Sequence, residues 1–237
     1  VNPIFKEGFL VCQDNPSHLA ESYVLLDNLI PNKKLFGWSD IESAGFPIFV
    51  NYYPFGFWIL ALINALPWLD VVNSYKLIVF ISYIAPSIGL FLLLKRIFNS
   101  EIGIIIAVML LFQYDFLSFT LNGIWSQYLS LFFGILYIIL INDLIRDGRY
   151  GIVKFLLLGI LFAFTLMSHL LSFIFIALYT LTSLAIYKFH NKVKLSKIIP
   201  YFIFAGIIGL VLSSVFLIPT LQTLSFLEQQ QGITSED

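Results

Sequence analysis

The sequence predicts an all-α polytopic membrane protein, and three observations support this. Hydrophobic residues make up 59% of the chain, charged residues 11%, and the mean hydropathy is +0.91. These values lie outside the range of soluble globular domains. Long apolar segments recur from residue 74 onward, whereas the first 54 residues are polar and rich in turn-forming residues. A polar segment held against apolar helices predicts a site at one face of a bilayer.

The polar segment itself is expected to contain an amphipathic helix over about residues 16–30. Asn15 suits a helix cap, Pro16 suits the first helical position, and Pro31 marks the end. Such a helix is suited to lying on a membrane surface. Its expected apolar face comprises Leu19, Tyr23, Leu26 and Ile30, joined by Leu25 and Leu29, with His18, Glu21 and Ser22 falling away from it.

The next segment, 55–69, is apolar but too short to cross the membrane, because a spanning helix needs about 20 residues. It follows Tyr53-Pro54, and Asn64 and Pro67 interrupt it. We therefore expect an interfacial or re-entrant helix here.

Six later segments are predicted to span the membrane. Two of them are separate helices, because a single helix over 152–187 would reach about 54 Å against a hydrocarbon core of about 30 Å. The chain is therefore expected to turn tightly at Ser168-His169. The predicted spans are 74–94, 101–120, 123–142, 152–168, 170–187 and 198–218.

Basic residues predict the orientation of these spans, because most of the 13 lie in alternate loops. By the positive-inside rule these loops are cytoplasmic, which places residues 1–72 on the extracytoplasmic side of a plasma membrane. If 55–69 did span, residues 1–54 would be cytoplasmic. The expected organisation is an external segment 1–72, a bundle 73–219 and a further external segment 220–237. The basic residues concerned are Lys95, Arg96, Arg146, Arg149, Lys154, Lys188, Lys192, Lys194 and Lys197.

Two carboxylates are the main candidates for chemistry. Asp14 precedes the first helix, where the helix dipole favours its ionised form. The carboxylate could bind a cation or deprotonate a hydroxyl. Alternatively, Asp14 is simply part of the helix cap with Asn15. Asp115 lies within an apolar span, where an ionisable residue is a functional candidate unless it is hydrated at the span's end. Both are expected to face the same compartment.

Other polar residues are expected at the same membrane face. His18, His169 and Gln127 are candidate ligand contacts, although a histidine in a short turn often only bonds a helix end. Lys76 can pair with a phosphate or snorkel to headgroups. Tyr53 suits either an aromatic belt or stacking on a sugar ring. The single cysteine, Cys12, excludes an internal disulfide, and no basic patch suited to nucleic acid is present.

Taken together, several short motifs resemble the GT-C superfamily of membrane glycosyltransferases. The closest resemblance is to the prokaryotic membrane proteins labelled "6-pyruvoyl-tetrahydropterin synthase related". The fold that this resemblance implies is a GT-C-like helical bundle with an external first loop containing juxtamembrane helices. The matching motifs are Asp14 to His18, Gly45-Phe46-Pro47, Tyr53-Pro54, Gly123-Ile124-Trp125-Ser126-Gln127, Ser168-His169-Leu170 and Phe216-Leu217-Ile218-Pro219.

The resemblance implies transfer of a sugar from a polyprenyl-phosphate donor in the membrane to an external acceptor. Asp14 would be the base or a ligand of a divalent cation such as Mg or Mn, and Asp115 the second acid. His169 or Lys76 would stabilise the leaving phosphate. This sequence departs from the family pattern in two ways: no transmembrane helix precedes the motif, which predicts a truncated chain, and Gln13 replaces the usual paired acid.

Two other functions are compatible with the sequence. One is a transporter of lipid-linked glycans, and the other is a non-catalytic protein that binds or assembles them. A continuous polar path through the bundle would favour transport.

Overall fold

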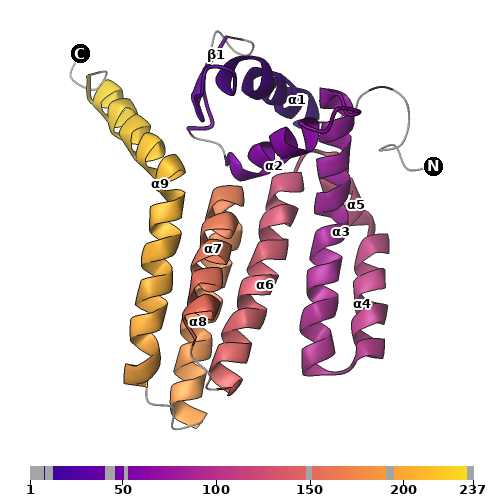
Figure 1. Ribbon diagram of the computed structural model, residues 1–237, viewed down its shortest axis with the longest axis vertical. Coiled ribbons are helices and arrows are strands. Elements are labelled where there is room, and N and C mark those ends of the chain that lie inside the picture. Colours follow the sequence, from indigo (N-terminus) through magenta and orange to yellow (C-terminus); the bar gives the residue numbers. More distant parts are fainter. Residues whose placement is uncertain are drawn as a thin grey trace.

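The structure is a computed structural model that describes Gly8 and residues 13–40, 46–50, 53–147, 151–190 and 195–233. Over these residues the chain is mostly α-helical (Figure 1), which confirms the predicted all-α polytopic membrane class. Within the described part, three helices are long and apolar enough to cross a membrane alone: Val71–Ile97, Trp125–Ile145 and Ile199–Thr223.

The bundle contains helices at all six predicted spans, but their lengths differ. The helices α4, α5 and α7 are shorter than the roughly 20 residues that a spanning helix needs. The bundle helices are α3 (Val71–Ile97), α4 (Ser100–Phe112), α5 (Tyr114–Leu121), α6 (Trp125–Asp147), α7 (Ile152–Ser168), α8 (Leu170–His190) and α9 (Leu195–Ile233).

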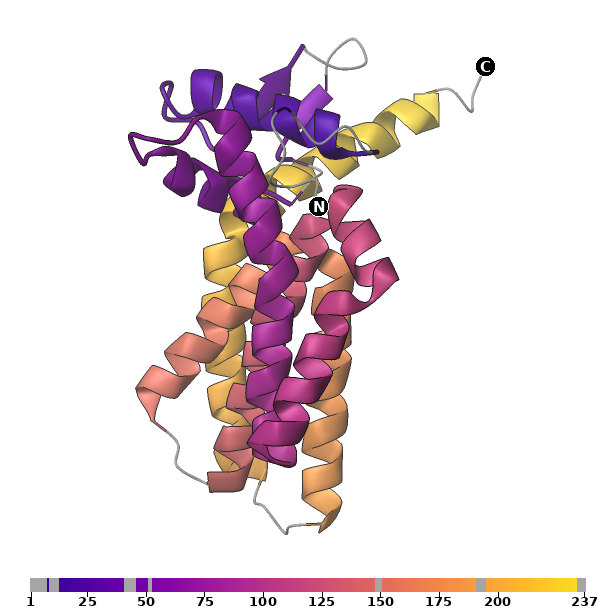
Figure 2. The same ribbon diagram turned by 90° about the vertical axis from the view of Figure 1, so that its right-hand side faces the viewer.

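The two ends of the bundle differ in composition. At one end, here called the α1 end, the polar first segment and α2 lie across the helices (Figures 1 and 2). At the other, the basic end, lie Lys95 and Arg96 in the last turn of α3 and Lys154 in the first turn of α7. Arg96 Nε lies 3.5 Å from Asp143 Oδ1, which ties α3 to α6 there. The other basic residues used for the orientation lie outside the described side chains.

The predicted span 101–120 is broken, so the expectation of one continuous helix there is wrong. Gln113 has extended backbone (ψ 124°), which ends α4. Its carbonyl accepts a bond from Leu117 N at 3.2 Å, which begins α5. Asp115 thereby lies in the first turn of a helix, where the dipole stabilises its charge.

The first helix forms where it was expected, but the predicted orientation of its faces is confirmed only in part: Leu25 and Leu29 lie in the core and Leu19 and Leu26 pack against it. α1 runs from Asn15 to Tyr23 and continues as a π-helical segment, η2 (Val24–Leu29). His18, Glu21 and Ser22 are buried together with Asn15, whereas Tyr23 and Ile30 are 39% and 44% exposed.

Two physical causes explain this orientation. The polar side chains find hydrogen-bond partners in the protein, so their burial is compensated. The wider π turn, marked by the bond from Ile30 N to Leu25 O (2.9 Å), also shifts the register. Leu25 and Leu29 therefore face the core instead of Tyr23 and Ile30.

Two further elements complete the layer at the α1 end. A short antiparallel hairpin pairs β1 (Gly37–Ser39) with β2 (Phe46–Ile48), where only turns were predicted. The helix α2 (Phe55–Asn64) has 10 residues and packs on α3 and α7. Beyond it, the Thr220 hydroxyl of α9 donates to the Val50 carbonyl, so α9 also reaches this layer.

α9 continues as a helix past the predicted end of its span at residue 218. Pro219 lies inside it, and Figure 1 shows the helix tilting away from the bundle toward its C-terminal end. A proline in a helix removes one backbone hydrogen bond and favours a bend, which accounts for this tilt.

One buried cluster joins this layer to the bundle. Trp125, at the start of α6, is fully buried and packs edge-on against Phe57 of α2 at 5.2 Å and Tyr75 of α3 at 6.0 Å. Leu25, Leu29 and Ile48 belong to the same cluster. The layer is therefore packed on the helices through apolar contacts.

Gly56 is the position where this packing is tightest. A Cβ at residue 56 would lie 2.8 Å from Cη2 of Trp125 and closer still to another ring atom. We predict that Gly56→Ala lowers the free energy of unfolding in detergent by about 1–3 kcal/mol, as overpacking does. The matched control is Gly206→Ala, where the added methyl meets nothing within 4 Å. Equal thermal stability of the two variants would contradict this packing.

Candidate functional site

The first candidate residue, Asp14, precedes α1 and contacts the turn between α5 and α6. The Asp14 N–H donates to the Asn122 carbonyl at 3.3 Å. Gly123 has a φ of +100°, and a Cβ there would lie 2.9 Å from Asp14 Cβ. Glycine meets both demands, the left-handed backbone and the close approach. The backbone of Asp14 is thus held directly against this turn.

The neighbouring residue, Asn15, fixes that position through a chain of buried hydrogen bonds. Its Nδ2 donates to the Leu121 carbonyl, and its Oδ1 accepts from the Tyr75 hydroxyl at 2.6 Å. The Tyr75 oxygen accepts in turn from Trp125 Nε1 at 3.1 Å. Asn15, Tyr75 and Trp125 are all fully buried. The start of α1 is therefore bonded to α3, α5 and α6 together.

His18 lies within the packed interior beneath α1. Its Nδ1 is 3.0 Å from Glu21 Oε2, and its ring lies edge-on to Phe57 at 5.7 Å and to Trp125 at 6.1 Å. The imidazole is 4% exposed. These contacts give His18 a role in the core of the α1 layer.

The carboxylate of Asp14, in contrast, is exposed to solvent. Its side chain makes no capping bond to α1, although its carbonyl accepts from His18 N at 3.0 Å. The capping explanation for this side chain is therefore not supported. An exposed carboxylate on a fixed backbone is suited to contact a ligand from the α1 side.

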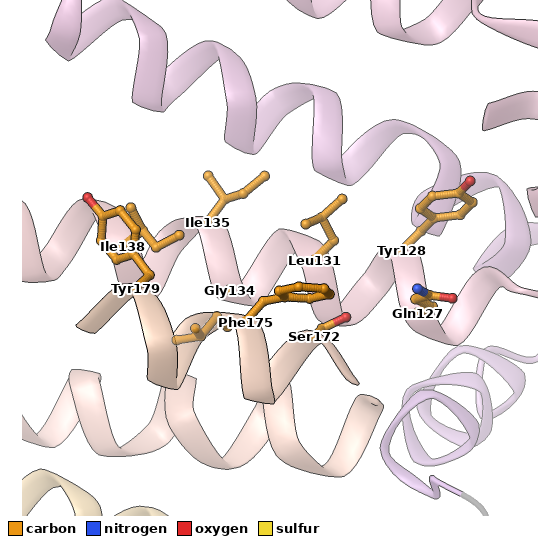
Figure 3. A pocket seen from close by; sticks show the side chains of 10 residues that line it. Gln127, Tyr128, Leu131, Gly134, Ile135, Ile138, Ser172, Phe175 and Tyr179 are labelled. Carbon is orange, nitrogen blue, oxygen red and sulfur yellow. The ribbon is translucent and has the colours of Figure 1, made fainter. Parts of the chain in front are cut away.

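A groove between α6 and α8 opens near this turn (Figure 3). It has a volume of about 390 Å³, and Gln127, Tyr128 and Ser172 lie at one end, with Ile138 and Tyr179 at the other. Gln127 lies in the first turn of α6, which begins at Trp125, and follows Gly123 by four residues. The first turn of α6 therefore joins the Asp14 position to the polar end of the groove.

Asp115 lies beside this polar end. Its charge acts on Tyr128, and the neighbouring Phe116 ring packs on the Tyr128 ring at 4.4 Å. Asp115 is itself exposed. The structure therefore places Asp115 and Gln127 in the same region.

His169 lies in the turn between α7 and α8. Its ring packs on Tyr53 at 5.0 Å, and its carbonyl accepts from the Ser130 hydroxyl at 3.5 Å. Burial lowers the pKa of His169, so the imidazole is neutral near pH 7. Its Nδ1 is buried with no hydrogen-bond partner among the described residues. His169 precedes Ser172, a groove residue, by one turn.

The two candidate acids contact opposite ends of α5. Asp14 contacts the C-terminal end of α5, whereas Asp115 lies in its first turn, about 10 Å away along a helix that rises 1.5 Å per residue. Among the described residues, no three His, Cys, Asp or Glu side chains gather where they could hold a metal ion.

The remaining candidate, Lys76, is half-buried on α3 directly after Tyr75. The residues that sequence reasoning missed are those that connect elements: Asn15 as a buried bridge, Tyr75 and Tyr128. Trp125 and Gln127 belong to the motif Gly-Ile-Trp-Ser-Gln (residues 123–127). This motif is the sequence signal that points to both residues. No local pattern pairs Asn15 with Tyr75, because they are 60 residues apart.

The fold and the site together define a polytopic helical membrane protein with a polar layer packed on one end of its bundle. Residues 50–235 match the family described as the 6-pyruvoyl-tetrahydropterin synthase related domain, a membrane protein. The chain belongs to this family. Asp14 and His18 precede the matched range, whereas Tyr53, Lys76, Asp115, Gln127 and His169 lie within it. No curated protein and no solved structure matches the chain.

The close approach at Gly123 can be tested directly. We predict that Gly123→Ala displaces Asp14 and speeds hydrogen–deuterium exchange over residues 13–23, because a Cβ would strain the backbone and overlap Asp14. Gly151→Ala is the control, since its added methyl meets nothing within 4 Å. Unchanged exchange in Gly123→Ala, measured by mass spectrometry, would contradict the described contact.

Proposed function

We propose that this protein is a GT-C-like glycosyltransferase of the plasma membrane, which moves a sugar from a polyprenyl-phosphate donor to an acceptor on the extracytoplasmic side. The observation that carries the proposal is the first turn of α6. It carries Gln127, at the polar end of the groove, and follows the turn against which the backbone of Asp14 lies. Both lie at the end of the bundle opposite Lys95, Arg96 and Lys154, which the positive-inside rule assigns to the cytoplasm.

In this proposal Asp14 is the general base. The acceptor hydroxyl or amide would bind above the α5–α6 turn, and its proton would pass to the Asp14 carboxylate as its heteroatom attacks the anomeric carbon. The bond from that carbon to the phosphate oxygen would break, and the lipid phosphate would leave. No step is assigned to a metal ion.

The leaving phosphate would be stabilised by Gln127, at the end of the groove, and by His169, in the turn between α7 and α8. Gln127 offers an amide N–H, and neutral His169 offers one ring N–H, both suited to oxygen atoms that gain charge in the transition state. Tyr53 packs on His169 and so fixes the orientation of its ring. Lys76 is a further candidate partner for phosphate.

A non-catalytic protein that binds lipid-linked glycans is the second candidate. The separation of Asp14 and Asp115 along α5 favours it, because paired carboxylates would be expected to converge on the reacting carbon. Transport is less well supported, since the polar groups named above gather at one end of the bundle.

The proposal predicts that Asp14→Asn in the full-length protein lowers transfer by at least about 100-fold, the usual effect of removing a general base. Transfer would be measured in membranes supplied with polyprenyl-phosphate hexoses carrying a radiolabelled sugar. Asp27→Asn is the matched control, since Asp27 is an exposed carboxylate of the same segment.

The two candidate functions give different results in this assay. Wild-type transfer in Asp14→Asn would remove Asp14 as the base. An absence of transfer by the wild-type protein for every donor, with retained binding of those donors, would support the non-catalytic function instead.

A further inference from the structure

The break between α4 and α5 lies at membrane depth. Lys76 and Lys95 are about 28 Å apart along α3 at 1.5 Å per residue, and the hydrocarbon core of a bilayer is about 30 Å thick. The two lysines therefore mark the edges of this core, since such side chains reach the headgroups. Between them, the Tyr83 hydroxyl donates to the Leu111 carbonyl near the end of α4. Tyr83 lies about 10 Å from Lys76 along α3, so α4 ends about 10 Å inside the core.

The length of α4 gives the same depth. This helix has 13 residues and rises about 20 Å. It begins beside Lys95, because a Cβ at Gly103 would lie 3.2 Å from Lys95 N. Starting from the basic end, α4 thus crosses about two thirds of the hydrocarbon core. Gln113, which follows α4, therefore lies in the leaflet on the α1 side, below the headgroups.

Polar side chains are exposed at this break. Phe112 and Tyr114 are 83% and 80% exposed, and Gln113 and Asp115 are exposed as well. Among the described residues, the side chains of Gln113 and Asp115 have no hydrogen bond or ion pair. The first N–H groups of α5 have no partner within that helix either. The break thus presents several unpaired polar groups on one surface.

Lipid tails cannot satisfy these groups. Hydrocarbon offers no hydrogen-bond partner, so irregular backbone at membrane depth is tolerated only where protein or enclosed water covers it. An aspartate in this region is also costly unless it is paired. α4 and α5 lie at the edge of the bundle (Figures 1 and 2), and no described helix beyond them encloses a water-filled space. Protein is therefore the cover that fits this surface.

The composition of this face also suits a protein interface. Aromatic side chains are enriched in such interfaces, and here Phe112 and Tyr114 flank the polar Gln113. The amide of Gln113 can donate and accept hydrogen bonds, which allows it to bond across to a second helix.

Asp115 determines the chemistry of the partner. An ionised carboxylate pairs best with Lys or Arg, and Arg can bond both of its oxygen atoms. In this sequence the Lys and Arg residues lie at the ends of the spans or outside them. A second copy of this chain therefore has no cation to offer at the depth of Asp115. A helix of a different protein is the source that fits.

We propose that the α4–α5 break is a docking site for a transmembrane helix of another protein, whose Lys or Arg side chain pairs with Asp115. The partner helix would pack beside Phe112 and Tyr114 and hydrogen-bond to Gln113. This assignment does not rest on glycosyl transfer, because it holds equally for a transferase and for a non-catalytic protein.

Hydrophobic photolabelling in the native membrane tests whether protein covers this face. A membrane-soluble phenyldiazirine is added to membranes of the cells that make the full-length protein, and labelled residues are mapped by mass spectrometry. Phe112 and Tyr114 should be protected. Val211, a 65% exposed residue near the middle of the span of α9, is the control and should be labelled. Equal labelling of Phe112 and Val211 would show that lipid covers the break and would overturn the proposal.

Asp115→Leu tests the charge pairing. Loss of the carboxylate should release the partner and raise the labelling of Phe112 to the level of Val211, whereas Asp115→Glu should keep Phe112 protected. Glu101→Leu is the matched control, since Glu101 is an exposed carboxylate of α4 at the basic end. Unchanged protection in Asp115→Leu would contradict the pairing. Thermal unfolding of each variant in detergent shows whether it is folded, and the labelling of the wild-type protein needs no variant.

A photo-crosslinker at residue 114 identifies what covers the break. Benzoylphenylalanine in place of Tyr114 is irradiated in the same membranes, and the crosslinked peptide is sequenced by mass spectrometry. The proposal requires a membrane-spanning segment of another protein that contains Lys or Arg. A lipid adduct, a segment of this same chain, or a spanning segment without a basic residue would overturn it. Rapid reaction of Tyr114→Cys, in a Cys12→Ser background, with a water-soluble maleimide would also overturn it, because water would then fill the break.

Discussion

The side chain of Asn15 bridges the polar first segment and the helix bundle. This side chain is fully buried. Its amide N–H donates to the Leu121 carbonyl at the end of α5, and its amide oxygen accepts from the Tyr75 hydroxyl. The Tyr75 oxygen accepts in turn from the Trp125 indole N–H. A buried polar group that loses its partner costs about 1–3 kcal/mol, so each member of this chain holds the others in place. Without this bridge, apolar contacts of the layer alone would not determine where α1 begins. With it, the backbone of Asp14 is fixed at the α5–α6 turn, where Gly123 leaves room for it.

This arrangement gives the first turn of α6 two roles. On one side it supports the segment that carries Asp14, and on the other it provides the polar end of a lipid-facing groove. A ligand with its headgroup near Gln127 would lie at the first turn of α6, directly after the turn that the backbone of Asp14 contacts. Asp115 lies beside Tyr128 at the same end of the groove. The basic end lies on the opposite side of the bundle, which is consistent with a site exposed to the extracytoplasmic side.

The sequence was sufficient for the membrane class and for the positions of most helices, because hydropathy and proline placement are local signals. It also predicted the tight turn at Ser168-His169, which lies between α7 and α8. The face of α1 could not be predicted in this way. The rule that apolar residues face the core fails when buried polar groups find partners far along the chain, as Asn15 does in Tyr75. The π-helical turns of η2 and the break at Gln113 also depend on packing rather than on local propensity. For the candidate site, the sequence singled out Asp14, Asp115, Gln127 and His169, but the groove between α6 and α8 has no signature in periodicity.

Cysteine accessibility measures the face of α1 most directly. In a Cys12→Ser background, Ser22→Cys and Tyr23→Cys would each be treated with a water-soluble maleimide in the detergent-solubilised protein. Ser22 is fully buried in the polar face and Tyr23 is 39% exposed, although the two are adjacent in the sequence. The docking of α1 by its polar side chains predicts rapid labelling at position 23 and protection at position 22 until the protein is denatured. Rapid labelling at position 22 with protection at position 23 would show that α1 buries its apolar face instead, and would contradict the account.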